Sequence, residues 1–497
     1  MDAMDFPFDG RMDKFKDVTC CTCPFLSLSI VHKKSFTKKK KFGNSNTKIL
    51  KEIVVMSKSV IDEDAPRLPD RDDLCLAHER GLNFWNEEYF RLMNTDESKV
   101  RPYTLPPLPD TLAEWERQKP MLMEQFKECL YGVMPPPPDT LELKLLAERD
   151  DALNGQALRR EYRVYCRMNN GRSFNFDMML YVPKKAKLPP PVFVQLNFSG
   201  NQNNSPDMDI RPTRAPAHTP GRWHSVGLST QPRGQDLERT NYVEAINRGY
   251  AVATACYGEI FPDNLDGFRK SIFTLFYDDL RPDCEVSLEE LKAGRRRNIG
   301  AYSAWAWGYS RIADVLEKIN LVDAQKLACV GHSRLAVASL WAGVNDPRFK
   351  LVCVNNSGKG GAQLTRRNFG ALSCILWFCR PNWVCDGFVR YINREDDLPF
   401  DQHQVLAMIA PRGLYVTSSS RDMNADPRGT FLSVMHASKI WELYGEKGLG
   451  CTEMPPVDTP IGGKVRYHVK TGRHSITSYD WEQYYNFADK LFGKPSV

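Results

Sequence analysis

Short apolar runs alternate with longer segments whose apolar residues recur every three to four positions along most of the chain. The runs Pro191–Phe198, Tyr250–Tyr257 and Leu327–Val330 are typical of strands that are buried on both faces of a sheet. The segments Asn298–Ile319 and Leu335–Trp341 have helical spacing instead. This alternation predicts a single α/β domain with a mostly parallel central sheet.

The chain before these strands has a pattern of its own. Thr111–Tyr131 is amphipathic with helical spacing, and the segments Arg160–Met168 and Ser173–Pro183 flank an Asn-Asn-Gly turn, which predicts a hairpin. A helix is expected around Val243–Arg248, and a terminal amphipathic helix is expected from Asp480 onward.

Residues 1–56 differ from the remainder. Much of the formal net charge of +6 lies in the lysine-rich run from Lys33 to Lys41, which is typical of a solvated tail. Contact with nucleic acid or an acidic membrane is the alternative, and we find no nucleic-acid motif to support it. The apolar stretch Val18–Val31 is too short to span a bilayer and follows acidic residues, unlike a signal peptide. We expect a disordered basic extension over 1–56, a catalytic domain over 57–497 and no membrane span.

The fourteen cysteines do not form a disulfide framework in the sequence. Cys20, Cys21 and Cys23 contain one Cys-x-x-Cys spacing without a second pair, so we expect no metal there. Cys256, Cys329 and Cys353 lie in apolar strands and are expected to be buried, reduced thiols.

The segment Lys326–Gly343 carries the clearest chemical signal. It predicts a buried strand that runs directly into a helix, with Ser333 at the corner, where its hydroxyl is lifted out of the sheet near free backbone N–H groups. Gly331 relieves crowding at such a bend, but Leu335 stands where the usual second glycine would be. The alternative is a small polar residue in a strand-to-helix loop.

A carboxylate and a base follow at later strand ends. Asp422 comes directly after the predicted strand Pro411–Arg421, and His474 follows the strand Val465–Lys470. The chain order Ser, Asp, His is that of α/β hydrolases, so we predict a three-layer sandwich with Ser333, His474 and Asp422 as a catalytic triad. As alternatives, Asp422 could only cap the next helix, and His474 could be a surface loop residue.

Several motifs together resemble the glucuronoyl esterases, also called 4-O-methyl-glucuronoyl methylesterases, and chiefly their bacterial branch. The resemblance covers roughly Thr111 to Phe492 and is carried by LNFSGN, GYAVATACYGEIFPD, AWAWGYSRIADVLE, GHSRL, NNSGKGGAQLTRRNFG, REDDLPFDQH, IAPRGLYV and DWEQYYNFAD. It implies a secreted α/β hydrolase that cleaves the ester between glucuronic acid on xylan and an alcohol of lignin without a metal or another cofactor.

The resemblance also implies roles for single residues. Ser333 matches the nucleophile, His474 the base and Asp422 the acid of bacterial members, whereas Asn356 holds the place of the fungal acid. Arg334 matches an arginine that helps to hold the oxyanion, which a fixed, always charged guanidinium is suited to do; a structural ion pair is the alternative. Ser199–Asn201 is expected to supply an oxyanion N–H. His332 is expected to point away from Ser333 and to be structural.

The chain departs from the family where sugar would bind. Ala336 and Val337 replace a Gly-Lys pair, and Lys359 replaces a cysteine. Ala371 replaces a glutamate, and Asn424 replaces a tryptophan that would stack on the pyranose. We therefore expect glucuronate affinity to be altered, since each lost charged hydrogen bond costs about 1.5–3 kcal/mol.

We expect a serine carboxylic-ester hydrolase that acts on a small-molecule or polysaccharide ester of glucuronic acid or a related uronate. The alternatives are a catalytically inactive carbohydrate-binding or scaffold homologue and a xylan acetyl esterase. We expect a monomer that does not bind nucleic acid. The lack of an export signal at the chain start predicts a cytoplasmic location, whereas the family resemblance implies secretion.

Overall fold

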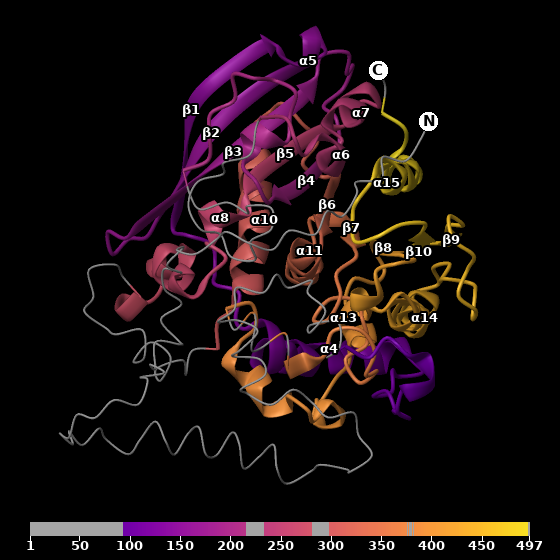
Figure 1. Cartoon of the computed structure of the whole chain (residues 1–497). Helices are drawn as coiled ribbons and strands as arrows, with labels where there is room; N and C mark the ends of the chain where they lie inside the picture. Colours follow the sequence, from indigo (N-terminus) through magenta and orange to yellow (C-terminus); the bar gives the residue numbers. More distant parts are fainter. Residues whose placement is uncertain are drawn as a thin grey trace, which may run out of the picture. The chain divides into compact units, whose positions relative to one another are not determined.

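One ten-stranded sheet forms the centre of the fold, in the order β1-β2-β3-β5-β4-β6-β7-β8-β10-β9 (Figure 1). The strands β5, β4, β6, β7, β8 and β10 run parallel to one another, while β1, β2 and β3 extend the sheet in antiparallel fashion and β9 closes the other edge. The strand bounds are β1 Thr140–Asp151, β2 Ala157–Arg167, β3 Ser173–Pro183, β4 Val192–Asn197, β5 Ala251–Cys256, β6 Leu327–His332, β7 Phe349–Asn355, β8 Gly413–Ser419, β9 Ile461–Gly462 and β10 Val465–Lys470.

This computed structural model describes residues 93–214, 233–280, 298–374, 376, 380 and 382–495. The chain divides into two units, Met1–Leu92 and Met93–Val497. The expected basic extension, its lysine-rich run and Cys20–Cys23 lie outside the described residues. The division into an extension over 1–56 and a catalytic domain over 57–497 therefore stays a prediction.

Helices connect the strands. The α-helices are α4 Leu112–Phe126, α5 Ala152–Gly155, α6 Leu237–Thr240, α7 Tyr242–Asn247, α8 Tyr257–Ile260, α10 Ala301–Lys318, α11 Arg334–Asn345, α13 Gln402–Ala407, α14 Pro427–Leu443 and α15 Ser478–Phe492. The shorter helical turns are η1 Glu97–Lys99, η2 Lys127–Tyr131, η3 Asn201–Asn203, η4 Leu265–Lys270, η5 Ile272–Leu275, η6 Asp278–Leu280, η7 Asp386–Tyr391, η8 Glu395–Asp397 and η9 Met423–Ala425.

Two apolar layers cover the two faces of the sheet. Side chains of β6 alternate between them, because Cys329 joins the cluster that includes α10, α11 and α14, whereas Ala328 and Val330 join the cluster that includes α7 and α15. Both layers consist of buried apolar side chains, which explains why the strands between them have continuous apolar runs. The predicted three-layer α/β-hydrolase sandwich is confirmed.

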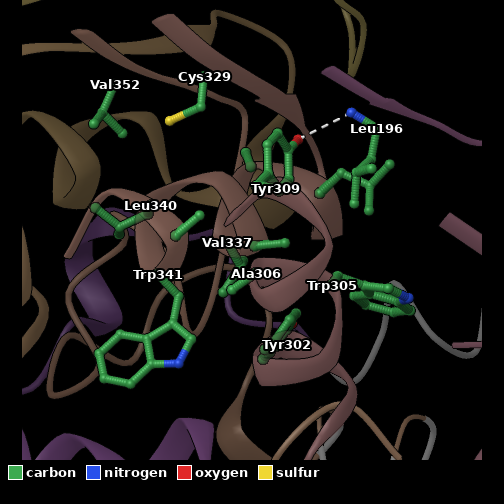
Figure 2. Close-up of a cluster of buried hydrophobic side chains, with 14 of the residues drawn as sticks. Leu196, Tyr302, Trp305, Ala306, Tyr309, Cys329, Val337, Leu340, Trp341 and Val352 are labelled. Atoms are coloured by element: carbon green, nitrogen blue, oxygen red, sulfur yellow. Dashed lines mark hydrogen bonds between the residues drawn. The ribbon is translucent and has the colours of Figure 1, made fainter. Parts of the chain in front are cut away.

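The helix α10 fixes the middle of the first layer (Figure 2). The hydroxyl of Tyr309 donates to the Val330 carbonyl at 2.8 Å and accepts from the Leu196 N–H at 3.3 Å, so one side chain ties α10 to β4 and β6. Val337 and Trp341 of α11 pack in the same cluster, and both side chains are fully buried. These contacts fix the end of β6 and the start of α11 relative to α10.

The predicted elements are present with small shifts at their ends, and one long strand was missed. The expected helix after Thr111 is α4, and the expected hairpin is formed by β2 and β3. The missed strand is β1, most of whose residues are exposed; its apolar and charged residues alternate only up to a bulge between Leu145 and Ala147.

The described cysteines lie as expected. Cys256, Cys329 and Cys353 are buried free thiols, and burial raises the pKa of Cys256 to about 12. In the described part of the chain, no helix combines the length and apolar character needed to cross a bilayer.

Candidate active site

Ser333 lies at the sharp turn between β6 and α11. Its backbone has φ 57° and ψ −133°, a strained conformation of the kind that is found at functional turns. A Cβ atom on Gly331 would stand 2.0 Å from the Leu335 carbonyl oxygen, so the first glycine of the motif is required by backbone contact. Leu335 itself is fully buried in the core, which shows that the turn forms without the second glycine.

Asp422 and His474 meet as the sequence predicts. The Nδ1 of His474 lies 2.6 Å from Oδ2 of Asp422, and the carboxylate side chain is 2% exposed whereas the imidazole is 24% exposed. The two residues follow β8 and β10, which are parallel neighbours in the sheet. Asp426, not Asp422, caps helix α14 by accepting the Gly429 N–H at 2.9 Å, so the capping alternative is wrong.

His332 joins this pair to the serine turn. Its ring centroid is 4.7 Å from that of His474, and it directly precedes Ser333. The Nδ1 of His332 lies 2.8 Å from the Asn355 side-chain oxygen, which fixes the ring from the opposite side. Burial, and then the nearby His474, holds the pKa of His332 well below its usual range, so this ring stays neutral beside the His474 imidazole.

Arg334 is clamped at the first turn of α11. Its Nη1 donates to Oδ2 of Asp263, whose Oδ1 accepts from Asn382 at 2.9 Å and from the Trp383 indole at 2.6 Å. The guanidinium lies 4.7 Å from the Trp383 ring centroid and 5.6 Å from that of Phe198. The structural ion pair weighed from the sequence therefore exists, and it holds Arg334 directly after Ser333.

The loop that carries His474 rests on two buried side chains. The Ser475 carbonyl accepts from Lys470 at 2.5 Å and from Asn356 at 3.2 Å, and the Ser419 hydroxyl accepts from both at 2.8 Å. Lys470 also pairs with Asp480 at 3.1 Å. Asn356, directly after β7, thus supports the backbone next to His474 rather than the imidazole itself.

The loop that follows β4 is held by its own side chains. The Gly200 N–H donates to the Asn197 side chain at 2.9 Å, and the Ser199 hydroxyl donates to Asp236 at 2.6 Å. The N–H of Gly200 therefore donates within the loop. Of the segment Ser199–Asn201, this leaves the N–H groups of Ser199 and Asn201 as the expected oxyanion donors.

The positions that depart from the family pattern fall into two groups. Ala336 and Val337 are fully buried in the core, and the buried Lys359 ammonium donates to the carbonyls of Leu364, Thr365 and Arg367. The side chains of these three residues therefore make contacts inside the protein that stabilise the fold. Ala371 and Asn424 are half-buried neighbours, since the Ala371 N–H donates to the Asn424 carbonyl at 2.9 Å, and Asn424 follows Asp422 by two residues in the chain.

Sequence reasoning missed Asp263, Trp383 and Lys470. Asp263 ends the motif GEIFPD, but nothing in its spacing connects it with an arginine 71 residues away. Lys470 ends the predicted strand Val465–Lys470, but its spacing gives no signal of its partners.

The chain is similar to several known proteins. A sequence profile described as "Glucuronyl esterase, fungi" matches residues 293–445. The carbohydrate esterase MZ0003, from an unknown prokaryotic organism, is 32% identical over 85% of this chain and 94% of its own length. A glucuronoyl esterase from Solibacter usitatus has a TM-score of 0.71 at 35% identity, covering 80% of this chain and all of its own. A promiscuous CE15 esterase from a marine bacterial metagenome has a TM-score of 0.69 at 31% identity, with the same coverage.

Proposed function

Because this chain belongs to the glucuronoyl esterases, a family of carbohydrate esterases, we propose that it hydrolyses esters of glucuronic acid or a related uronate with Ser333 as the nucleophile. It is a carboxylic ester hydrolase by this membership. The single observation that carries the residue assignment is the Asp422–His474 pair at 2.6 Å, with the imidazole packed on the residue before Ser333.

In the proposed mechanism, His474 takes the proton from the Ser333 hydroxyl as Oγ forms a bond to the ester carbonyl carbon. Asp422 fixes Nδ1, so the proton arrives at Nε2 and the resulting imidazolium is stabilised. The carbonyl oxygen becomes an oxyanion, which Arg334 and backbone N–H groups of the turn stabilise. His474 then protonates the alcohol as its bond to the acyl carbon breaks.

The second half of the reaction repeats these roles with water. His474 takes a proton from water, whose oxygen attacks the acyl-enzyme, and the proton returns to Oγ as the acid is released. The neutral His332 beside the imidazole adds no repulsive charge to the imidazolium that forms in each half.

Ser333→Ala tests this assignment. The variant is expected to lose hydrolysis of benzyl glucuronate by at least about 1,000-fold, as loss of a nucleophile does in serine hydrolases. Ser339→Ala, on the same helix but bonded to the Ala336 and Cys353 carbonyls, is the matched control and is expected to keep its activity. Undiminished turnover in Ser333→Ala would refute the nucleophile.

An inactive carbohydrate-binding or scaffold homologue is the second candidate, favoured by Ala371 and Asn424 at the site. The intact Asp422–His474 pair opposes it. Labelling with a fluorophosphonate probe separates the two, because only an activated serine reacts. Release of acetate from xylan without action on glucuronate esters would instead identify an acetyl esterase.

The location and assembly of the protein remain proposals. We propose secretion, as the family resemblance implies, and nothing in the comparisons supports a cytoplasmic location. A peptide map of the native protein's N-terminus would identify a cleaved leader. We predict a monomer that does not bind nucleic acid. Light scattering, which measures the mass of the particles in solution, tests this prediction.

A further inference from the structure

Asp263 is a buried carboxylate behind Arg334. It is 1% exposed, and its two oxygens accept from Arg334, Asn382 and Trp383. Burial alone would raise its pKa, but Arg334 and Arg380, together with the hydrogen bonds, hold the pKa of Asp263 below its usual range. Asp263 is therefore ionised, and it compensates the charge of Arg334 in the resting site.

The reaction changes the charge that faces this pair. The ester substrate is neutral at its carbonyl, whereas the acid that leaves is a carboxylate at neutral pH. During release, one carboxylate oxygen occupies the place that the oxyanion held, next to Arg334. A bare guanidinium in a buried site would hold this product by a charge-assisted, bidentate pair.

We propose that Asp263 is a positioning and specificity-determining residue that fixes Arg334 and makes the site favour the neutral ester over its carboxylate product. This inference rests on the proposed function. The Asn382 and Trp383 donors hold Oδ1, so Oδ2 faces Arg334 and the guanidinium is fixed in direction between the Phe198 and Trp383 rings. The fixed Arg334 guanidinium donates to the oxyanion in a set direction. The carboxylate product is attracted less strongly, because Asp263 compensates the charge of Arg334.

The test measures binding without turnover. In a Ser333→Ala background, calorimetry gives the affinities of glucuronate and of its neutral isostere glucuronamide, and their ratio isolates the effect of charge. Asp263→Asn is expected to shift this ratio toward glucuronate by about tenfold or more, and Arg334→Gln is expected to shift it the other way. The double variant is expected to return close to the starting ratio, because neither charge remains.

The control is Asp346→Asn, which breaks a buried ion pair with Arg348 at 2.7 Å at the far end of α11 and is expected to leave the ratio unchanged. If Asp263→Asn does not fold, the opposite shift in Arg334→Gln carries the test. Equal weakening of both ligands in the single variants, or no glucuronate binding in any variant, overturns the proposal. Failure of the proposed function would show separately, as absence of benzyl glucuronate hydrolysis in the protein with Ser333 intact.

Discussion

Lys470→Met tests the support of the His474 loop most directly. The Lys470 ammonium is buried and contacts the Ser419 hydroxyl, the Ser475 carbonyl and the Asp480 carboxylate. Methionine has a similar length but cannot donate, so the substitution removes the charge and all three contacts while filling much of the same space.

The magnitude follows from what the substitution leaves behind. Removing one partner of a buried ion pair costs about 3–5 kcal/mol, because the other charge stays buried. Asp480 keeps three donors, namely His468 at 3.0 Å and the N–H and hydroxyl of Thr477 at 2.8 and 3.0 Å. We therefore expect a loss near the lower limit, about 3 kcal/mol in the free energy of unfolding.

Activity is expected to fall further than stability explains. The Ser475 carbonyl keeps only its longer bond from Asn356, at 3.2 Å, so the backbone next to His474 is held less firmly while the Asp422 contact remains. At a temperature where the variant is fully folded, kcat on benzyl glucuronate should fall by about 10- to 100-fold.

The assay pairs urea unfolding with steady-state kinetics at pH 7. Lys439→Met, which removes the surface pair with Asp110, is the matched control and is expected to change neither quantity measurably. An Lys470→Met protein that is destabilised but keeps full kcat would show that the network serves the fold alone, and the positioning argument would then be wrong.

Two further outcomes follow from the geometry. Gly331→Ala should abolish activity and lower the thermal midpoint sharply, because its Cβ would stand 2.0 Å from the Leu335 carbonyl; a folded, active variant in circular dichroism and kinetics would contradict the turn geometry. Stability should fall as pH drops from about 6.5 toward 4, since burial lowers the pKa of His403 to about 4 and the unfolded chain then binds the extra proton. This is worth on the order of 3 kcal/mol, and His403→Gln should flatten the pH dependence measured by urea unfolding over this range.

The sequence was sufficient for elements whose pattern is set by burial. β4, β6 and β8 are buried along their whole length, so their ends could be placed from the sequence, and with them the positions of Ser333 after β6 and Asp422 after β8. β1 was missed because most of its residues are exposed and a bulge between Leu145 and Ala147 breaks its alternation.

Contacts between loops were beyond prediction for a different reason. Asp263 finds Arg334 across 71 residues and Trp383 across 120, and no periodicity relates such positions. His332 was expected to be structural. Its ring nitrogen does contact the Asn355 side chain, but the ring also packs on His474. The parallel pairing of β6, β7, β8 and β10 brings the carboxyl ends of these strands to one edge of the open sheet.

The neighbouring ends of β7 and β8 divide one task between them. Asp422 after β8 contacts the ring of His474, and Asn356 after β7 holds the peptide beside it. Two adjacent strands thus reach the same loop, one through a side chain and the other through the backbone. Because β7 and β8 are paired in parallel, a change at either strand end acts on the same loop.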